Sequence, residues 1–282
     1  MKKVAVVTDS TSYIPDEIVK QYAISVAPQI LIWGEETFED GVDILPSAFY
    51  TRLKTAKIMP STSQVTPGKF HKIFGALLEQ DYHVLALLLS EKLSGTIASA
   101  VQACDEFPGA PIEIVDSYTT AMALGFQVLT VARAAQEGAN LEECKKLAEG
   151  ARQHTGVVFA VDTLEFLHRG GRIGGASRFL GTALNIKPIL EVVNGHVEAI
   201  ERVRTRQKSM ERLLDILQER IAGRQPVRLA TLHAQAPEDA KTLLEMAKLR
   251  FSTVEHIFSE VSPVVGTHAG PGTVGLAFMA GM

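Results

Sequence analysis

Short apolar runs alternate with longer helical segments through the first half of the chain, and this alternation limits the possible folds more than any other feature. Residues 3–7, 84–89 and 112–115 are runs of strand length in which apolar residues predominate. Helical segments lie between them, and Pro46 and the Thr66-Pro67 pair stand where a first-turn proline would begin a helix. The alternation is typical of βαβ units, so it predicts a three-layer α/β/α domain with a mainly parallel sheet.

The second half has a different pattern. Residues 189–193 and 197–203 are two strand-like runs joined by Asn194-Gly195, which is the strongest short-range signal for a β-hairpin. This half therefore contains antiparallel pairing, and we expect a two-layer α/β domain with a mixed sheet. Its other expected elements are helices at 207–221 and 237–251, strands at 157–161 and 227–231, and two strand-like runs around Gly270-Pro271-Gly272.

The change of pattern places a domain boundary near residue 155, which gives domains 1–155 and 156–282. The first has 13 Lys/Arg against 19 Asp/Glu, and the second has 15 against 13. Residues 168–208 alone hold eight Lys/Arg and three Asp/Glu. This basic stretch is either an ordinary solvated face or a docking surface for a partner. A DNA-binding regulator ranks last, because the chain has a net charge of -4 and no helix-turn-helix motif.

Composition excludes several other classes of protein. A hydrophobic content of 46% with 21% charged residues is typical of a globular chain. Cys104 and Cys144 lie in helix-like segments without CxxC or Cys/His spacing, so we expect free thiols. The apolar run after Lys2-Lys3 is too short for a signal peptide, and no segment has about 20 uninterrupted apolar residues. We therefore expect a cytoplasmic protein.

Hydroxyl side chains recur where strands of the predicted sheet should end. They occur in residues 8–12, 61–63, 94–96, 116–117 and 119–120. Open α/β sheets bind ligands at the carboxyl ends of their strands, and helix N-termini there attract anions. Each segment alone is better explained as a helix cap. As a set, they indicate an anion site.

Sequence motifs for nucleotide, hydrolase and metal sites are missing. The glycine-rich run 170–175 has neither phosphate-loop order, and Ser94-Gly95 follows Leu93 rather than completing a G-x-S-x-G elbow. None of the eight histidines forms an H-E-x-x-H pair. We expect no cofactor and no metal.

Six blocks together carry a more specific signal. In chain order they are Val6-Val7-Thr8-Asp9-Ser10-Thr11, Pro60-Ser61-Thr62-Ser63-Gln64, Leu93-Ser94-Gly95-Thr96, Val115-Asp116-Ser117, Leu167-His168-Arg169-Gly170-Gly171-Arg172 and His268-Ala269-Gly270-Pro271-Gly272-Thr273-Val274-Gly275. Spanning about residues 4–278, they resemble the DegV family of bacterial proteins.

The resemblance implies a two-domain α/β fold with a long-chain fatty acid, such as palmitate, stearate or oleate, in the cleft between the domains. By motif position, Thr62 and Ser94 bind the carboxylate and His268 completes the polar cluster, although a lone histidine near glycines is more often structural. The supporting head-group loops are Ser61, Gly95, Thr96, Ser117, Thr120 and Gly270.

The resemblance also implies a partner. In the best understood members, the protein presents its fatty acid to a separate ATP-dependent kinase, which forms an acyl-phosphate for phospholipid synthesis. This chain would then be the non-catalytic subunit of a fatty acid kinase. The basic stretch would dock the kinase, or touch an anionic membrane transiently, through Arg172, Arg202, Arg204 and Arg206.

Physical chemistry is compatible with such a ligand. Burying about 14 methylenes at roughly 0.8 kcal/mol each yields on the order of 11 kcal/mol before ordering costs. Hydroxyls and backbone N–H groups can satisfy the carboxylate, and we expect no Lys or Arg in the cleft. The alternative function is a self-sufficient transferase or hydrolase that acts on an acyl or phosphorylated small molecule at the same cleft.

Overall fold

A four-stranded parallel sheet forms the centre of the first half of the chain in the computed structural model, which describes residues 2–181 and 186–282. Its order is β2-β1-β6-β7, formed by Ser25–Ala27, Val4–Asp9, His83–Leu88 and Ile112–Asp116. Strand β6 is buried on both faces, which explains its unbroken apolar sequence. Leu85 and Leu87 pack on one face of the sheet, while Val84 and Ala86 pack on the other.

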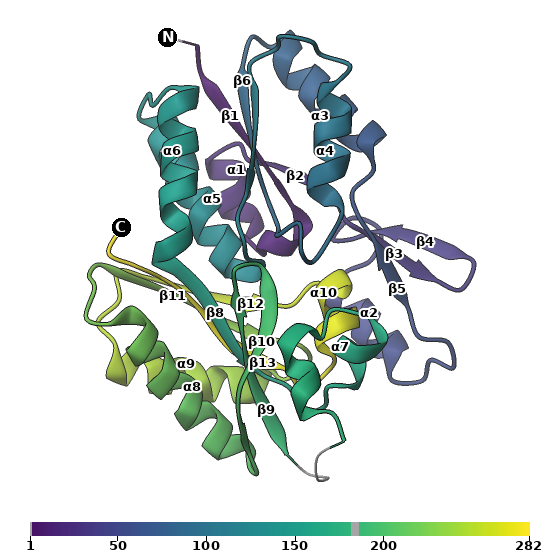
Figure 1. Ribbon diagram of the computed structural model, residues 1–282, viewed down its shortest axis with the longest axis vertical. Coiled ribbons are helices and arrows are strands. Elements are labelled where there is room, and N and C mark those ends of the chain that lie inside the picture. Colours follow the sequence, from purple (N-terminus) through teal and green to yellow (C-terminus); the bar gives the residue numbers. More distant parts are fainter. Residues whose placement is uncertain (1, 182–185) are drawn as a thin grey trace.

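Helices cover both faces of this sheet, as predicted (Figure 1). Helices α3 (Pro67–Glu79) and α4 (Thr96–Cys104) pack on one face, and α5 (Ala121–Gln136) and α6 (Leu141–Ala151) pack on the other. Two predicted helix starts are confirmed, because Pro46 begins α2 (Pro46–Leu53) and the Thr66 side chain caps α3.

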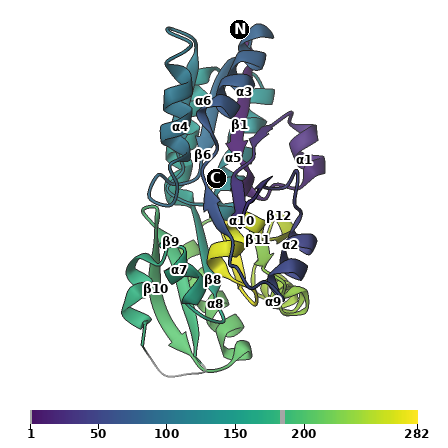
Figure 2. The ribbon, with the colours of Figure 1, turned by 90° about the vertical axis from the view of Figure 1, so that its right-hand side faces the viewer.

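A six-stranded sheet forms the centre of the second half, and its order is β10-β9-β8-β13-β11-β12. The strands are His196–Val203, Lys187–Val193, Thr155–Ala160, Val274–Ala280, Val227–His233 and Glu255–Glu260. Only the β11–β12 pair is parallel, so the sheet is mixed, as predicted. Helices α8 (Arg206–Ile221) and α9 (Pro237–Arg250) cover one face (Figures 1 and 2).

Helix α5 joins the two halves, because it packs on the parallel sheet and also on β8 and β13. One buried cluster takes residues from both halves, including Leu87, Phe126 and Ala277. The boundary near residue 155 separates the two sheets but does not separate their cores. The division into domains 1–155 and 156–282 therefore stays a prediction.

The predicted β9–β10 hairpin is confirmed. Val193 pairs with His196, and the two turn residues have positive φ, 48° for Asn194 and 84° for Gly195. Two positive φ angles define a type I′ turn, which explains the Asn-Gly sequence. The turn lies against the loop after β6, because a Cβ on Gly195 would be only 2.2 Å from Ser90 Oγ. The hairpin of the second half therefore contacts the carboxyl edge of the parallel sheet.

A third sheet was not predicted. It is antiparallel, with the order β4-β3-β5, formed by Glu36–Glu39, Ile30–Trp33 and Ser61–Ser63. Pro28 interrupts the mainly apolar segment 24–33 and cannot donate a ladder hydrogen bond, and β2 and β3 on either side of it lie in different sheets. Residues 61–63, expected at a strand end, form a strand themselves.

A second correction concerns the segment before Gly270. A strand-like run was expected there, but strand β12 ends at Glu260 and helix α10 (Pro263–Ala269) follows. Pro263 occupies the first turn, where its missing N–H removes no helical bond. The short elements η1 (Ser10–Ser12), α1 (Asp16–Gln21), η2 (Arg152–His154), α7 (Glu165–Arg169) and η3 (Gly174–Phe179) complete the fold.

Two expectations from composition can be compared with the structure. Cys104 and Cys144 are free thiols, as predicted. Within residues 2–181 and 186–282, no helix combines the length and the apolar sequence needed to cross a bilayer.

Candidate ligand-binding site

A mainly apolar cavity lies where the carboxyl edge of the parallel sheet meets the second sheet, and residues from both halves line it. About 940 Å³ inside it is not filled by atoms, and part of this space is open to solvent. The apolar lining residues are Leu89, Leu93, Ala121, Val157, Phe159, Leu167, Val192, Val197, Leu232, Val261, Val264, Val265 and Ala269. The polar ones are Thr11, Tyr13, Gln29, Thr62, Ser63, Gln64, Ser94, Thr120, Arg172, His268 and Thr273.

Thr62 and His268 meet at the polar part of this lining. Thr62 lies in the middle of β5 and His268 in the last turn of α10, and Thr62 Oγ1 is 2.8 Å from His268 Nε2. Burial, with a smaller contribution from the nearby charge of Arg172, lowers the pKa of His268 from 6.5 to about 4. The imidazole is therefore neutral at pH 7 and offers one donor and one acceptor.

Gly170 explains how His268 fits into this position. A Cβ on Gly170 would lie 2.0 Å from His268 Nδ1, so only glycine allows the end of α7 to approach the ring this closely. Nδ1 is buried and has no hydrogen-bond partner among the described residues. The glycine-rich run therefore shapes the surroundings of His268 instead of forming a phosphate loop.

Ser94 lies just before α4 and is held by the residues that follow it. Its Oγ is 2.9 Å from Thr96 Oγ1, and the Gln29 amide lies against the same Thr96 hydroxyl, with Nε2 at 2.9 Å and Oε1 at 3.1 Å. Thr96 and Gln29 are both buried. Ser94 therefore lines the cavity while the buried Thr96 and Gln29 hold it in place.

The structure brings some predicted site residues to the cavity and leaves others behind it. Thr62, Ser94, His268 and Thr120 line it. The Ser117 hydroxyl instead closes a turn with the backbone of Thr119, and Ser61 is exposed. Gly95 and Gly270 are outside the lining but leave room for neighbours, because added Cβ atoms would meet Gln64 at 3.2 Å and Phe166 at 2.4 Å. Roles in ligand binding stay predictions for all of them.

The expectation of a cleft without Lys or Arg is wrong, because Arg172 lines the cavity. Its Nε donates to Leu93 O at 3.0 Å and its Nη1 donates to Gly170 O at 2.7 Å. These bonds tie the glycine-rich loop to the loop that carries Ser94. Because Leu93 is 79 residues away in sequence, nothing near Arg172 indicated this contact. The proposed docking surface therefore has to rely on the other arginines.

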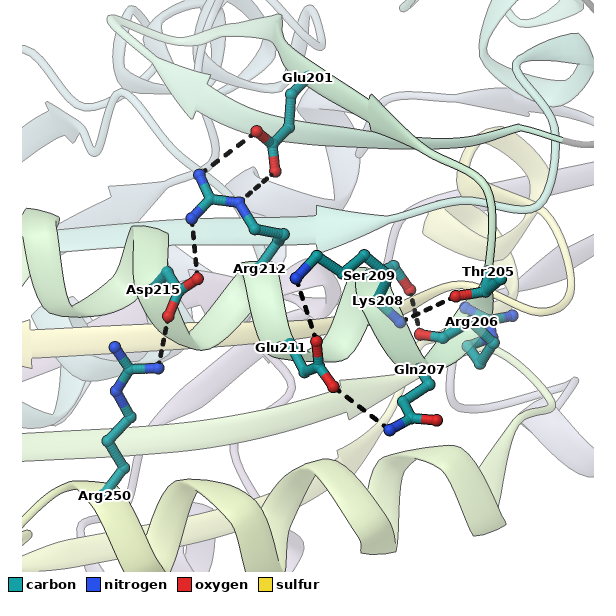
Figure 3. Close-up of polar contacts among 10 residues, drawn as sticks. All are labelled: Glu201, Thr205, Arg206, Gln207, Lys208, Ser209, Glu211, Arg212, Asp215 and Arg250. Carbon is teal, nitrogen blue, oxygen red and sulfur yellow. Dashed lines mark hydrogen bonds and ion pairs between the residues drawn. The ribbon is translucent and has the colours of Figure 1, made fainter.

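Some cations of the basic stretch 168–208 pair with carboxylates and others do not, and residues 182–185 within it lie outside the described residues. Arg206 binds Asp162 and Asp239. Lys208 binds Glu211 in the first turns of α8, as Figure 3 shows. Arg202 and Arg204 are exposed. The Arg202 guanidinium lies 4.9 Å from the centre of the Phe179 ring, and Arg204 has no ion pair among the described residues.

Sequence interpretation missed several polar residues of the site. Gln29 stands alone between two strands without any motif. Gln64 belongs to the Ser-Thr-Ser-Gln block, so its position in that block was the available signal. Thr11 lines the cavity from the segment after β1, where the hydroxyl pattern had suggested an anion site. Across residues 2–181 and 186–282, no group of three or more His, Cys, Asp or Glu is arranged to hold a metal ion.

Comparisons with known proteins give one consistent result. The profile of a family described as "Uncharacterised protein, DegV family" matches residues 3–281. A DegV domain-containing protein of Streptomyces coelicolor is 36% identical over 98% of both chains. A solved DegV family protein from Thermus thermophilus, described as fatty acid binding, is 35% identical over 99% of both chains, with a TM-score of 0.93. The solved structure of DegV from Bacillus subtilis, described as a fatty acid binding protein, is 32% identical with a TM-score of 0.90, covering 99% of this chain and 100% of that one.

Proposed function

This chain belongs to the DegV family, and we propose that it binds a long-chain fatty acid such as palmitate, stearate or oleate in the cavity described above. Thr62 and Ser94 hold the carboxylate, His268 supports them, and the apolar lining takes the tail. The observation that carries the proposal is the Thr62–His268 pair, which opens with Ser94 onto one mainly apolar cavity. The fatty-acid binding described for the related Thermus and Bacillus proteins gives it independent support.

The lining offers each part of such a ligand a suitable partner. Apolar burial of the tail supplies most of the affinity, because each methylene contributes roughly 0.8 kcal/mol. The carboxylate needs donors in place of water, and the two hydroxyls can each donate once. The lowered pKa of His268 keeps its ring neutral, so the neighbouring Arg172 is the cation of the site and favours an anionic head group.

The first test of this function is the ligand that the protein carries. We expect a long-chain fatty acid in a denaturing extract of purified protein, measured by mass spectrometry. Repeated extracts without a fatty acid, together with turnover of acyl or phosphorylated substrates by the protein alone, would instead support the self-sufficient transferase or hydrolase.

The second test concerns the assigned hydroxyls. Thr62→Ala and Ser94→Ala should each weaken palmitate binding by about 1 to 3 kcal/mol, because each removes a hydrogen bond to a buried charged group. Thr37→Ala is the matched control, since Thr37 is an exposed threonine on β4 of the same sheet. Wild-type affinity in the double variant at Thr62 and Ser94 would contradict the assignment.

We further propose that the protein is not itself an enzyme and presents its ligand in the cytoplasm to an ATP-dependent fatty acid kinase, for phospholipid synthesis. A carboxylate oxygen would attack the γ-phosphate of ATP, and acyl-phosphate and ADP would result. The exposed Arg202 and Arg204 are the proposed docking residues, and brief contact of the same face with anionic lipid would accompany ligand exchange.

Charge reversal tests the docking proposal. Arg202→Glu with Arg204→Glu should strongly slow phosphorylation of the bound fatty acid while leaving its affinity unchanged. Lys241→Glu with Lys248→Glu is the control, because it makes the same charge change on the exposed side of α9. Equal phosphorylation rates in the two double variants would remove this docking surface.

A further inference from the structure

Asp40 is a buried carboxylate at the end of β4, between two parts of the candidate site. It is 2% exposed, and among the described residues it forms no ion pair with Lys, Arg or His. Its Oδ2 accepts a hydrogen bond of 2.6 Å from the Ser10 hydroxyl, and its Oδ1 accepts one of 3.3 Å from the Val264 backbone N–H. A buried charge without a cationic partner is unfavourable, so its position calls for a physical reason.

The first oxygen leads to Ser94. Ser10 Oγ accepts the backbone N–H of Gln29 at 3.1 Å, and the Asp40 backbone N–H donates to Gln29 O at 2.9 Å. The Gln29 side chain in turn holds Thr96, whose hydroxyl is 2.9 Å from Ser94 Oγ. A continuous run of hydrogen bonds therefore connects Asp40 to Ser94 through Gln29.

The second oxygen leads to His268 and Thr62. Val264 is the second residue of α10, and His268 follows one turn later in the same helix, 2.8 Å from Thr62 Oγ1. The Tyr50 hydroxyl also anchors this region by donating to Val261 O at 3.1 Å. Unlike the Tyr50 bond, the bond from Val264 N–H to Asp40 connects α10 to the hydrogen bonds that hold Ser94.

We propose that Asp40 is the positioning residue of the head-group site, holding Ser94 and the Thr62–His268 pair at a fixed separation through its two carboxylate oxygens. The inference rests on the proposed binding of a fatty-acid carboxylate. Only an ionised carboxylate accepts on both oxygens at once, whereas an amide would turn a donor toward one of the two partners. Small displacements of such a site are enough to lose a directed hydrogen bond.

The surroundings of Asp40 make its charged form unfavourable, so this carboxylate lowers the stability of the fold. Burial, with a smaller contribution from the charge of Asp9 in β1, raises the pKa of Asp40 from 3.8 to about 6. Tyr13 and Tyr50 also face it, and burial raises the pKa of both well above 10, so they remain uncharged. The protein keeps a charged group where a neutral one would be easier to bury.

The experiment uses the full chain, freed of lipid, and the Asp40→Asn variant. Dissociation constants at pH 7.5 are measured for hexadecanoic acid and for hexadecanol, which has the same tail without the carboxylate. We expect Asp40→Asn to reduce the preference for the acid about tenfold or more, while the affinity for the alcohol stays within about twofold and the unfolding temperature does not fall. Asp43→Asn is the matched control, since Asp43 is an exposed carboxylate three residues away.

Two results with Asp40→Asn would overturn the inference, and a third result would refute the proposed function instead. An unchanged ratio of acid to alcohol affinity in Asp40→Asn overturns it, and a parallel fall of both affinities with a lower unfolding temperature assigns Asp40 a purely structural role. A wild-type protein that binds neither compound refutes the proposed function instead.

If Asp40→Asn fails to fold, Ser10→Ala takes its place, because it breaks only the connection from Asp40 to Ser94. We expect Ser10→Ala to lower the preference for the acid, and an unchanged preference overturns the proposal.

Discussion

His268 makes the ligand-free protein sensitive to pH in a way that one substitution can isolate. Its pKa falls from 6.5 to about 4 on folding, first because the ring is buried and second because Arg172 is near. Below pH 6.5 the unfolded chain binds a proton that the folded protein does not accept until about pH 4. Stability contributed by His268 is therefore complete above pH 6.5 and is lost as the pH falls toward 4.

The size of this contribution follows from the two pKa values. A change from 6.5 to about 4 corresponds to about 3 kcal/mol, as an upper value because the ring lines a cavity that water can enter. About 2 kcal/mol of it is already lost at pH 5. Asp40 acts in the opposite direction, because its raised pKa gives stability that is complete below 3.8 and is lost as the pH rises through 6. The two groups partly cancel in the wild-type protein.

The measurement therefore compares a variant with the wild type at each pH. Urea unfolding of lipid-free wild type and His268→Gln at pH 7.5 and pH 5 gives the loss of stability caused by the substitution. We expect that loss to be about 2 kcal/mol larger at pH 7.5 than at pH 5. His196→Gln on β10 is the matched exchange at an exposed histidine. An equal loss for His268→Gln at both pH values would refute the assignment of a neutral, buried imidazole.

Three further predictions follow from single contacts. Gly170→Ala should displace the His268 ring, because its Cβ would lie 2.0 Å from Nδ1, and calorimetry should then show weaker palmitate binding. Asn140→Ala should lower the free energy of unfolding by about 1 kcal/mol through loss of the capping box of α6, with unchanged palmitate binding. The free energy of unfolding of Asp40→Asn relative to the wild type should be about 2 kcal/mol higher at pH 7.5 than at pH 4, because only the wild type must bury a charge at the higher pH. Urea unfolding measures this difference, and an equal difference at both pH values would contradict the raised pKa of Asp40.

Elements were predictable where their residues favour a single backbone conformation. Asn194-Gly195 identified the β9–β10 hairpin, because few other residues adopt two consecutive positive φ angles. The unbroken apolar run of β6 identified a strand buried on both faces. Strand β5 could not be found this way, because Ser61–Ser63 has no apolar residue and gains its place only by pairing with β3.

Some residues of the candidate site could be selected from the sequence, but their arrangement could not. Motif position selected Thr62 and His268, yet their contact joins residues 206 positions apart, and no local pattern encodes such a distance. The same holds for Arg172, which looked like part of a basic surface until the fold placed it beside Leu93. Asp40 lies in an acidic, turn-rich segment whose sequence indicates only exposure, and burial there depends on α10.

Strand β13 gives the order in which this architecture can be completed during synthesis. Val274–Ala280 is the last strand along the chain, yet it lies inside the six-stranded sheet between β8 and β11. On the ribosome, β8 therefore lacks one of its two neighbours until residue 280 has emerged, and the cavity wall that includes Gly275 is missing as well. A nascent chain can complete the parallel sheet early, but it completes the wall of this cavity only after β13 has been synthesised.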